Sequence, residues 1–162
     1  MTKPPQNFAG PYVHATAVLI GENGLLIRGR SGAGKSRLAR ALMEEATRSG
    51  QLARLIGDDR IGLEPRNGRL LAHPHAALAG QMEFRGQGIG KMAYEQSALL
   101  RLVVDITPYD RKANTPPRLP EKNAQHIVLE GVTLDYIHVI EDDAPATSAA
   151  AIVAFLKGLQ TN

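Results

Sequence analysis

The sequence has no cysteine and no tryptophan, and only 4% of its 162 residues are aromatic. The absence of cysteine excludes disulfides and thiolate chemistry. Few aromatic rings and a net charge of only +3 argue against a nucleic-acid surface, which needs stacking platforms and a strongly basic face. No apolar run approaches the roughly 18 residues that cross a bilayer, and no apolar signal segment follows the first residues. We therefore expect a cytoplasmic protein that binds neither nucleic acid nor membrane.

The length suits one domain, because 43% hydrophobic residues are enough to build a single core. Residues 1–12 are polar and contain proline, so we expect a flexible lead followed by a domain over residues 13–162. Hydrophobic patterning predicts helices over residues 36–49 and 147–159. It predicts strands over residues 13–20, 25–28, 52–56, 99–106, 128–129 and 134–140, and a hairpin over residues 60–72 that is closed by Asn67-Gly68.

The strongest motif is the run Gly29-Arg30-Ser31-Gly32-Ala33-Gly34-Lys35-Ser36, which matches the phosphate-loop pattern G-x-x-x-x-G-K-[ST]. The glycines let backbone N–H groups turn toward an anion, and the following helix adds the positive end of its dipole. Lys35 can reach the outer phosphates, and the Ser36 hydroxyl is a usual ligand of nucleotide-bound Mg²⁺. Since a strand pattern precedes the loop and a helix pattern follows it, we interpret residues 29–36 as a nucleotide-phosphate site. The competing interpretation is a Gly/Ser turn with an incidental lysine.

Two adjacent carboxylates, Asp58 and Asp59, follow the predicted strand over residues 52–56. An acidic residue at the end of a strand near the phosphate loop can hold Mg²⁺ directly or through water. A second carboxylate could take the proton from an attacking hydroxyl group. The alternative is a pair of surface aspartates that begin a turn.

Two further segments are candidates for the same site. His14 lies near the start of the first strand of a predicted hairpin whose second strand leads into the phosphate loop, so antiparallel pairing would bring the imidazole near the phosphates. A histidine that is merely exposed is an equally good interpretation. Residues 83–90 combine Glu83, Arg85 and three glycines, which is typical of a loop where the backbone approaches a ligand. An ordinary flexible loop is the alternative.

Together these motifs resemble the catalytic domain of HPr kinase/phosphorylase. The resemblance rests on His14-Ala15-Thr16, residues 29–36, Gly57-Asp58-Asp59 and Glu83-Phe84-Arg85-Gly86, in this order and spacing. The E-x-R-G loop discriminates best, because phosphate loops occur in many families. Asp110-Arg111 also fits the pattern.

The resemblance implies a compact single-domain α/β phosphate-loop kinase fold, related to phosphoenolpyruvate carboxykinase, with a central mixed sheet and flanking helices. It implies a kinase that transfers the γ-phosphoryl group of ATP to a serine of HPr, the phosphocarrier of the phosphotransferase system. The loop from Gly29 to Ser36 would hold ATP, and Ser36 with Glu83 would support Mg²⁺. Asp58 would be the base, Asp59 and His14 would complete the pocket, and Arg85 would orient groups around it. Members are commonly hexamers.

Two departures modify these expectations. Only about a dozen residues precede the histidine strand, which resembles a short form of the family. Many members carry a basic segment near the C-terminus, where this sequence has the acidic run Glu141-Asp142-Asp143. If that run faces the site it should repel phosphate, which predicts that the protein acts predominantly as a kinase. If the run points to solvent, its charges are screened and the direction of catalysis is set elsewhere.

Two other classes of function fit part of the pattern. A small-molecule kinase would need basic residues in a lid, and Arg111, Lys112 and Arg118 could serve. A nucleotide-dependent regulatory module would signal through its bound state. The pair Asp58-Asp59 argues against that module, because a pure binder needs no base beside the metal ligand.

Overall fold

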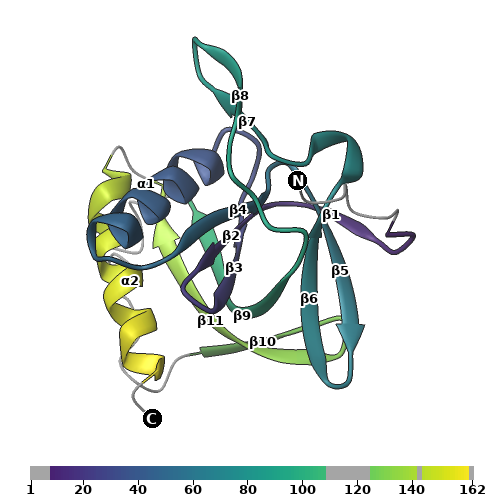
Figure 1. Ribbon diagram of the computed structural model, residues 1–162. Coiled ribbons are helices and arrows are strands. Elements are labelled where there is room, and N and C mark those ends of the chain that lie inside the picture. Colours follow the sequence, from purple (N-terminus) through teal and green to yellow (C-terminus); the bar gives the residue numbers. More distant parts are fainter. Residues whose placement is uncertain (1–7, 109–124, 142–143, 161–162) are drawn as a thin grey trace.

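The computed structural model describes residues 8–108, 125–141 and 144–160. Within these ranges the chain forms two α-helices, one short 3-10 helix and eleven strands (Figure 1). The strands are β1 (Tyr12–His14), β2 (Thr16–Ile20), β3 (Asn23–Arg28), β4 (Ala53–Gly57), β5 (Arg60–Arg66), β6 (Arg69–Pro74), β7 (Gln81–Phe84), β8 (Gly88–Lys91), β9 (Ala98–Thr107), β10 (Gln125–Leu129) and β11 (Val132–Ile140). The helices are α1 (Lys35–Arg48), η1 (Ala76–Leu78) and α2 (Pro145–Gln160). None of these helices is long and apolar enough to span a bilayer.

A mixed central sheet organises the chain. Its strand order is β1-β5-β6-β9-β3-β2-β4, and β11 adds to β9 while β10 adds to β11. Strand β2 is antiparallel to both β3 and β4, so β3 and β4 run in the same direction, and β9 and β11 run parallel to β3. The carboxyl ends of β3, β4, β9 and β11 therefore share one edge of the sheet. Segments that follow these strands are brought together there, whatever their separation in sequence.

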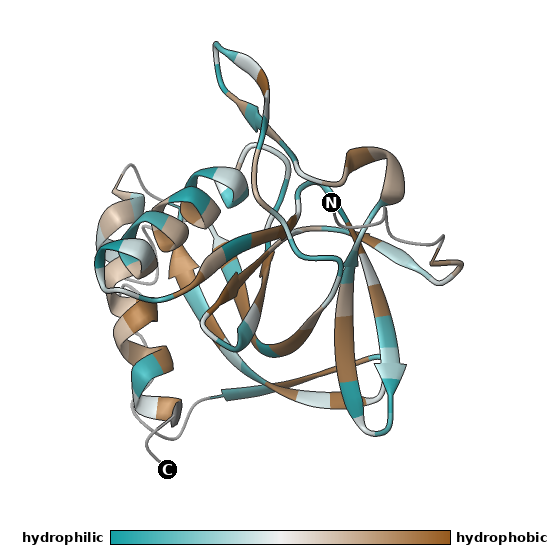
Figure 2. Ribbon diagram, viewed as in Figure 1, coloured by the Kyte–Doolittle hydropathy of each residue, from teal (hydrophilic) through white to brown (hydrophobic). Residues whose placement is uncertain are grey.

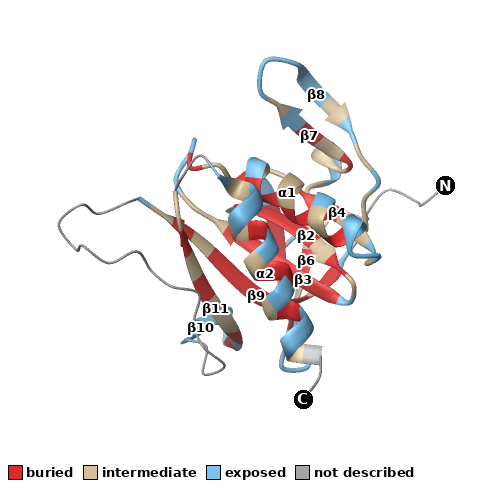
Figure 3. Ribbon diagram, turned by 90° about the vertical axis from the view of Figure 1, so that its left-hand side faces the viewer, coloured by how far each residue is buried: buried red, intermediate tan, exposed pale blue. Residues whose placement is uncertain are grey.

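Helices α1 and α2 lie side by side against one face of the sheet (Figure 1). The inner face of α1 carries the apolar residues that the helical spacing predicts, and Leu42 and Ala46 are fully buried. These side chains share one core with Leu25 and Ile27 of β3 and Ile152 of α2. Hydrophobic residues accordingly concentrate on the central strands (Figure 2), and the buried positions lie beneath the helices (Figure 3).

A second core fills the other face of the sheet. Here Leu26 of β3 and Val103 of β9 pack with Ile61 and Leu70 of the β5–β6 hairpin. The hairpin turns at Asn67 and Gly68, whose positive φ angles of 53° and 75° are those of the predicted Asn-Gly turn. The sheet is thus covered on both faces, so its central strands are buried over most of their length.

The predicted elements are mostly present, with two differences. The helix predicted over residues 36–49 and the strands around residues 25–28, 52–56 and 99–106 are confirmed within one or two residues. The single strand expected from Val13 to Ile20 is wrong, because it is interrupted at Ala15. The part before Ala15 is β1, which pairs with β5, and the part after it is β2, which pairs with β3. Residues 83–90 form the end of the β7–β8 hairpin, which projects from the body of the molecule (Figure 3).

A polar cluster joins β3, β9 and β11 on the face opposite the helices. The Arg28 guanidinium donates to both oxygens of Asp105, over 2.7 and 2.8 Å, and the Tyr136 hydroxyl donates to the same carboxylate over 2.9 Å. The hydrogen bond to Asp105 raises the pKa of Arg28, and burial raises the pKa of Tyr136. Both groups therefore stay protonated donors at neutral pH and fasten three strands just before the phosphate loop.

We expect Asp105→Asn to lower the free energy of unfolding by about 1–3 kcal/mol. The amide has one acceptor oxygen in place of two, sets an NH2 group against a donor and leaves the partly buried Arg28 without its anion. Urea unfolding measures this change. Asp135→Asn is the matched control on β11, because the one ion pair of Asp135 with a described residue is to the exposed His126. That control should change stability by less than about 0.5 kcal/mol. Equal losses in both variants would contradict the structural importance of the cluster.

Candidate active site at the carboxyl edge of the sheet

The phosphate loop leaves β3 at Gly29 and enters α1 at Lys35. Gly32 and Gly34 have φ angles of 81° and 100°, in the left-handed region that favours glycine. A Cβ at Gly29 would lie only 3.1 Å from the Ala33 Cβ and 3.2 Å from the Ile106 carbonyl oxygen. The first turn of α1 contains no acidic residue, so nothing there offsets the positive end of the helix dipole. The loop therefore has the shape and the polarity of an anion cradle.

Lys35 is the buried cation of this loop, with 7% of its surface exposed. Its Nζ donates to the carbonyl oxygens of Gly29 and Arg30, over 2.9 and 3.0 Å. Burial lowers the pKa of Lys35, while the charges of Asp58 and Asp59 act in the opposite direction. The ammonium group is thus folded back on the loop, close to where a phosphate would replace the two carbonyl contacts.

Asp58 contacts the phosphate loop directly. The Ser36 hydroxyl donates to the Asp58 carboxylate, with Oγ 3.0 Å from Oδ1 and 2.9 Å from Oδ2. The Thr16 hydroxyl donates to Oδ1 over 2.7 Å. Hydroxyl and carboxylate oxygens are ligands that Mg²⁺ prefers, and here they lie together beside a phosphate cradle. The residues therefore fit a Mg²⁺ site, with Asp58 beside the hydroxyl that the motif assigns to the metal.

Asp59 differs from Asp58 in its backbone conformation and in its exposure to solvent. The Arg60 N–H donates to the Asp58 carbonyl oxygen over 2.9 Å, which closes a three-residue turn with Asp59 at its centre and a φ of 72°. A non-glycine residue in this conformation is strained, and such strain is often found at functional sites. The Asp59 carboxylate lies 2.9 Å from Nδ1 of His14, and both side chains are more than half exposed. Asp59 is thus an accessible carboxylate beside an imidazole.

The strand pairing that places His14 beside Asp59 is not the one expected from the sequence. We expected pairing within the first hairpin to place it, but β1 pairs with β5, and His14 lies opposite Arg60. The backbone N–H of Ala15 also donates to the Asp59 carbonyl oxygen over 3.3 Å. The histidine is therefore held against the Asp58-Asp59 turn rather than against β3.

A cavity of ≈950 Å³ collects these residues. All the predicted site residues line it except Gly29 and Arg30; it contains His14, residues 31–36, Asp58, Asp59, Glu83 and Arg85. Glu83 and Arg85 come from the β7–β8 hairpin, which closes one side. Phe84 of this hairpin lies under the guanidinium of Arg40, with the Arg40 Cζ 4.6 Å from the ring centroid. That contact attaches the hairpin to α1.

Two cavity residues carry no motif that would mark them in the sequence. Arg37 and Arg40 line the cavity from one face of α1, three residues apart. The only signal is their position one turn into a helix that begins at a phosphate loop. They extend the positive face of the cavity beyond Lys35.

Glu141 also lines the cavity, although local sequence patterns could not predict its position there. It follows β11 at the same edge of the sheet. The Arg30 guanidinium contacts its carboxylate at 3.0–3.2 Å, which ties the phosphate loop to the end of β11. The acidic run therefore begins at the site rather than in open solvent. Asp142, Asp143, Asp110-Arg111 and the proposed lid residues Arg111, Lys112 and Arg118 lie outside the described residues.

Comparison with known proteins agrees with this arrangement. A sequence model of the HPr Serine kinase C-terminal domain matches residues 7–154. The chain is 34% identical over 110 residues to the HPr kinase/phosphorylase of Lactobacillus delbrueckii subsp. bulgaricus, covering 63% of this chain and 33% of that protein. It is 29% identical over 134 residues to the HPr kinase/phosphorylase of Mycoplasma mycoides, covering 78% and 41%.

A solved structure shares the fold. The HPr(Ser) kinase/phosphatase from Coxiella burnetii superimposes with a TM-score of 0.72 at 20% identity, covering 93% of this chain and 99% of that one. The chain is thus similar to a whole solved chain, while it spans less than half the length of the two curated relatives named above. The expected α/β phosphate-loop kinase fold with a mixed central sheet and flanking helices is confirmed.

Proposed function

Because the chain belongs to the family of the HPr serine kinase C-terminal domain, we propose that it transfers the γ-phosphoryl group of ATP to a serine of the phosphocarrier HPr. The observation that supports this most is the contact of Ser36 with Asp58, with Lys35 folded onto the same loop. A phosphate cradle, a hydroxyl ligand and a carboxylate within one cavity are what phosphoryl transfer from Mg²⁺-ATP requires. We further propose that the protein works in the cytoplasm as a homo-oligomer, a hexamer by resemblance.

The loop from Gly29 to Ser36 would hold the phosphates of ATP. Ser36 would ligate Mg²⁺, with Asp58 beside it and Glu83 facing it from the β7–β8 hairpin. Bound Mg²⁺ would neutralise charge that develops on the phosphate oxygens. Lys35 would exchange its two carbonyl partners for phosphate oxygens, and Arg85 would orient the groups that enter from the hairpin side.

In the transfer step, the serine oxygen of HPr forms a bond to the γ-phosphorus while the bond to the bridging β–γ oxygen breaks and ADP leaves. The serine proton must pass to a base. The family resemblance gives this role to Asp58, and that assignment stays a prediction. The geometry favours different roles for the two carboxylates. The Asp58 oxygens already accept hydrogen bonds from Ser36 and Thr16, whereas the Asp59 carboxylate is exposed beside His14. We propose that Asp58 positions the cation and that Asp59 takes the proton.

The direction of catalysis is a separate part of the proposal. Glu141 carries its negative charge to the wall of the cavity and pairs with Arg30 of the phosphate loop. A free inorganic phosphate would have to bind near this carboxylate, and Arg30 is already engaged by it. We therefore propose that the protein acts predominantly as a kinase.

The test uses the purified full chain in both directions. Incubation with γ-labelled ATP, Mg²⁺ and HPr should label one serine of HPr, which phosphopeptide mapping locates. Serine-phosphorylated HPr with excess inorganic phosphate should release little pyrophosphate. Label on a small molecule but not on HPr would indicate a small-molecule kinase. Nucleotide binding without any transfer would indicate a regulatory module. Brisk pyrophosphate release would contradict the proposal that the protein acts predominantly as a kinase.

A further inference from the structure

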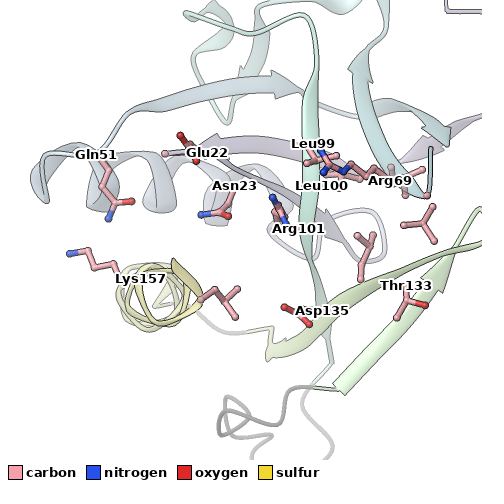
Figure 4. A pocket seen from close by; sticks show the side chains of 16 residues that line it. Glu22, Asn23, Gln51, Arg69, Leu99, Leu100, Arg101, Thr133, Asp135 and Lys157 are labelled. Carbon is pink, nitrogen blue, oxygen red and sulfur yellow. The ribbon is translucent and has the colours of Figure 1, made fainter. Parts of the chain in front are cut away.

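A second cavity lies at the other end of the central sheet, away from the phosphate loop. Figure 4 shows the side chains that line it. It measures ≈1040 Å³ and shares no lining residue with the candidate active site. Its walls come from the β2–β3, β5–β6 and β10–β11 turns, the start of β9 and the last turns of α2. Strand β3 has the cavity at its first residue and the phosphate loop at its end, and six residues of strand span about 20 Å. The two cavities are therefore separate sites.

The walls of this second cavity carry an excess of positive charge. Arg69, Arg101 and Lys157 line it from three different elements. Within the described part of the chain, none of these three side chains has an ion pair or a side-chain hydrogen bond. The acidic lining residues are Glu22 and Asp135, and Asp135 is paired with the imidazole of His126 at 3.2 Å. Among the described lining residues, three cations thus outnumber two carboxylates.

The placement of Arg101 is a specific feature of the backbone. Gly24 pairs with Leu100 and Leu25 pairs with Leu102, so Arg101 lies at a register shift and has no partner on β3. An extra residue in a strand turns its side chain out of the regular alternation, and bulges are frequent beside functional sites. Arg101 is also the only cation between Ala98 and Thr107. Figure 4 shows its side chain between Asn23 and Arg69.

Asn23 supplies an independent observation. It is 8% exposed, and its Nδ2 has no hydrogen-bond partner among the described residues. Buried polar groups are nearly always satisfied, so an amide left without an acceptor calls for an explanation. The side chain lies on the wall of the second cavity between Gln51 and Arg101, across from Lys157 and Asp135 (Figure 4). A small rotation of the amide would let an acceptor oxygen in the cavity satisfy it.

We propose that this cavity binds a small organic anion through its carboxylate or phosphate oxygens. Arg69 and Arg101 offer planar guanidinium groups, which match such oxygens in pairs, and Lys157 adds a mobile charge from α2. Asn23 donates the hydrogen bond that fixes the orientation of the anion. The partly exposed side chains of Leu99 and Leu159 form part of the lining and would contact its carbon skeleton. The site takes a ligand distinct from the nucleotide.

The experiment titrates the ¹⁵N-labelled full chain separately with citrate and with inorganic phosphate, and follows the NMR spectrum. The Asn23 side-chain amide and the backbone amides of Gly21, Gly68 and Thr133 report on the second cavity, while residues 29–36 report on the phosphate loop. We expect saturable shifts of the first group with at least one of the two anions. The anion that acts identifies the carboxylate or the phosphate class.

Two variants make the test specific. Arg101→Gln should weaken the binding at the second cavity at least tenfold. Arg66→Gln, which removes the same charge opposite Arg69 in the β5–β6 hairpin but does not line the cavity, should change it less than twofold. Arg69→Gln replaces Arg101→Gln if the spectrum of the latter shows a disturbed fold. Shifts confined to residues 29–36, shifts that do not saturate, or equal affinity in the variants and the wild type would overturn the proposal.

Discussion

Replacement of Lys35 by alanine is expected to lower the rate of phosphoryl transfer about a hundredfold or more and to weaken ATP binding. A preorganised charge at a transferring phosphate stabilises the transition state by roughly 3 kcal/mol. Lys35 can supply this charge, because its buried ammonium group is held on the loop by two carbonyl oxygens that phosphate oxygens would replace. The rate is measured with labelled ATP and HPr, and the affinity by titration calorimetry.

The pKa of Lys35 gives this prediction a second readout. Burial lowers that pKa in the free protein, whereas phosphate oxygens favour the ammonium form and would raise it. Between the two values the protein must take up a proton when it binds phosphate, so affinity should fall as the pH rises through this alkaline window. Calorimetry in buffers of different ionisation enthalpy measures the uptake, which should disappear in Lys35→Ala.

Lys91→Ala is the matched control, because Lys91 is an exposed lysine at the end of β8 and does not line the active-site cavity. It should keep the rate of the wild type within about twofold. A Lys35→Ala protein with more than half of the wild-type rate would refute the assignment of the phosphate loop.

Local sequence predicts the parts of this site that depend on backbone chemistry. The phosphate loop needs glycines at Gly32 and Gly34, where φ is positive, and the β5–β6 turn needs Asn67-Gly68 for the same reason. The helix after the loop follows from apolar spacing, and its buried apolar residues recur at that spacing. Such features require only a few neighbouring residues, so the sequence contains all that determines them.

Features that depend on strand order are beyond the reach of local patterns. Arg28 faces Asp105 because β3 and β9 are parallel neighbours in one particular register, although the two residues are 77 positions apart in sequence. Arg30 meets Glu141 only because β3 and β11 end at the same edge. The position of His14 depends on a break at Ala15, where nothing in the residue types interrupts the strand pattern. Each of these contacts is set by which strands pair, and that is decided by the packing of the whole core.

The two carboxylates of the Asp58-Asp59 turn can be separated by their expected kinetic effects. Asp58 is bound to the Ser36 hydroxyl, so Asp58→Asn should weaken Mg²⁺-ATP binding by about 10- to 100-fold, as the loss of a residue that orients a metal ligand does. The Asp58→Asn variant should lower the rate of phosphoryl transfer mainly because it binds Mg²⁺-ATP more weakly. Calorimetry with Mg²⁺-ATP and the rate at saturating ATP measure the two effects separately.

Asp59→Asn should keep the affinity for Mg²⁺-ATP within a few fold and lower the rate of transfer about a thousandfold, because an amide cannot take the serine proton. Its stability should change little, since asparagine tolerates the φ of 72° that this position imposes. Asp59→Gly is the matched variant: it fits the same backbone without strain, so it should be equally inactive while remaining folded in urea titrations. If instead Asp58→Asn keeps its affinity and loses transfer, while Asp59→Asn remains active, then Asp58 is the base, as the family resemblance implies. The strained turn would then serve only to place it.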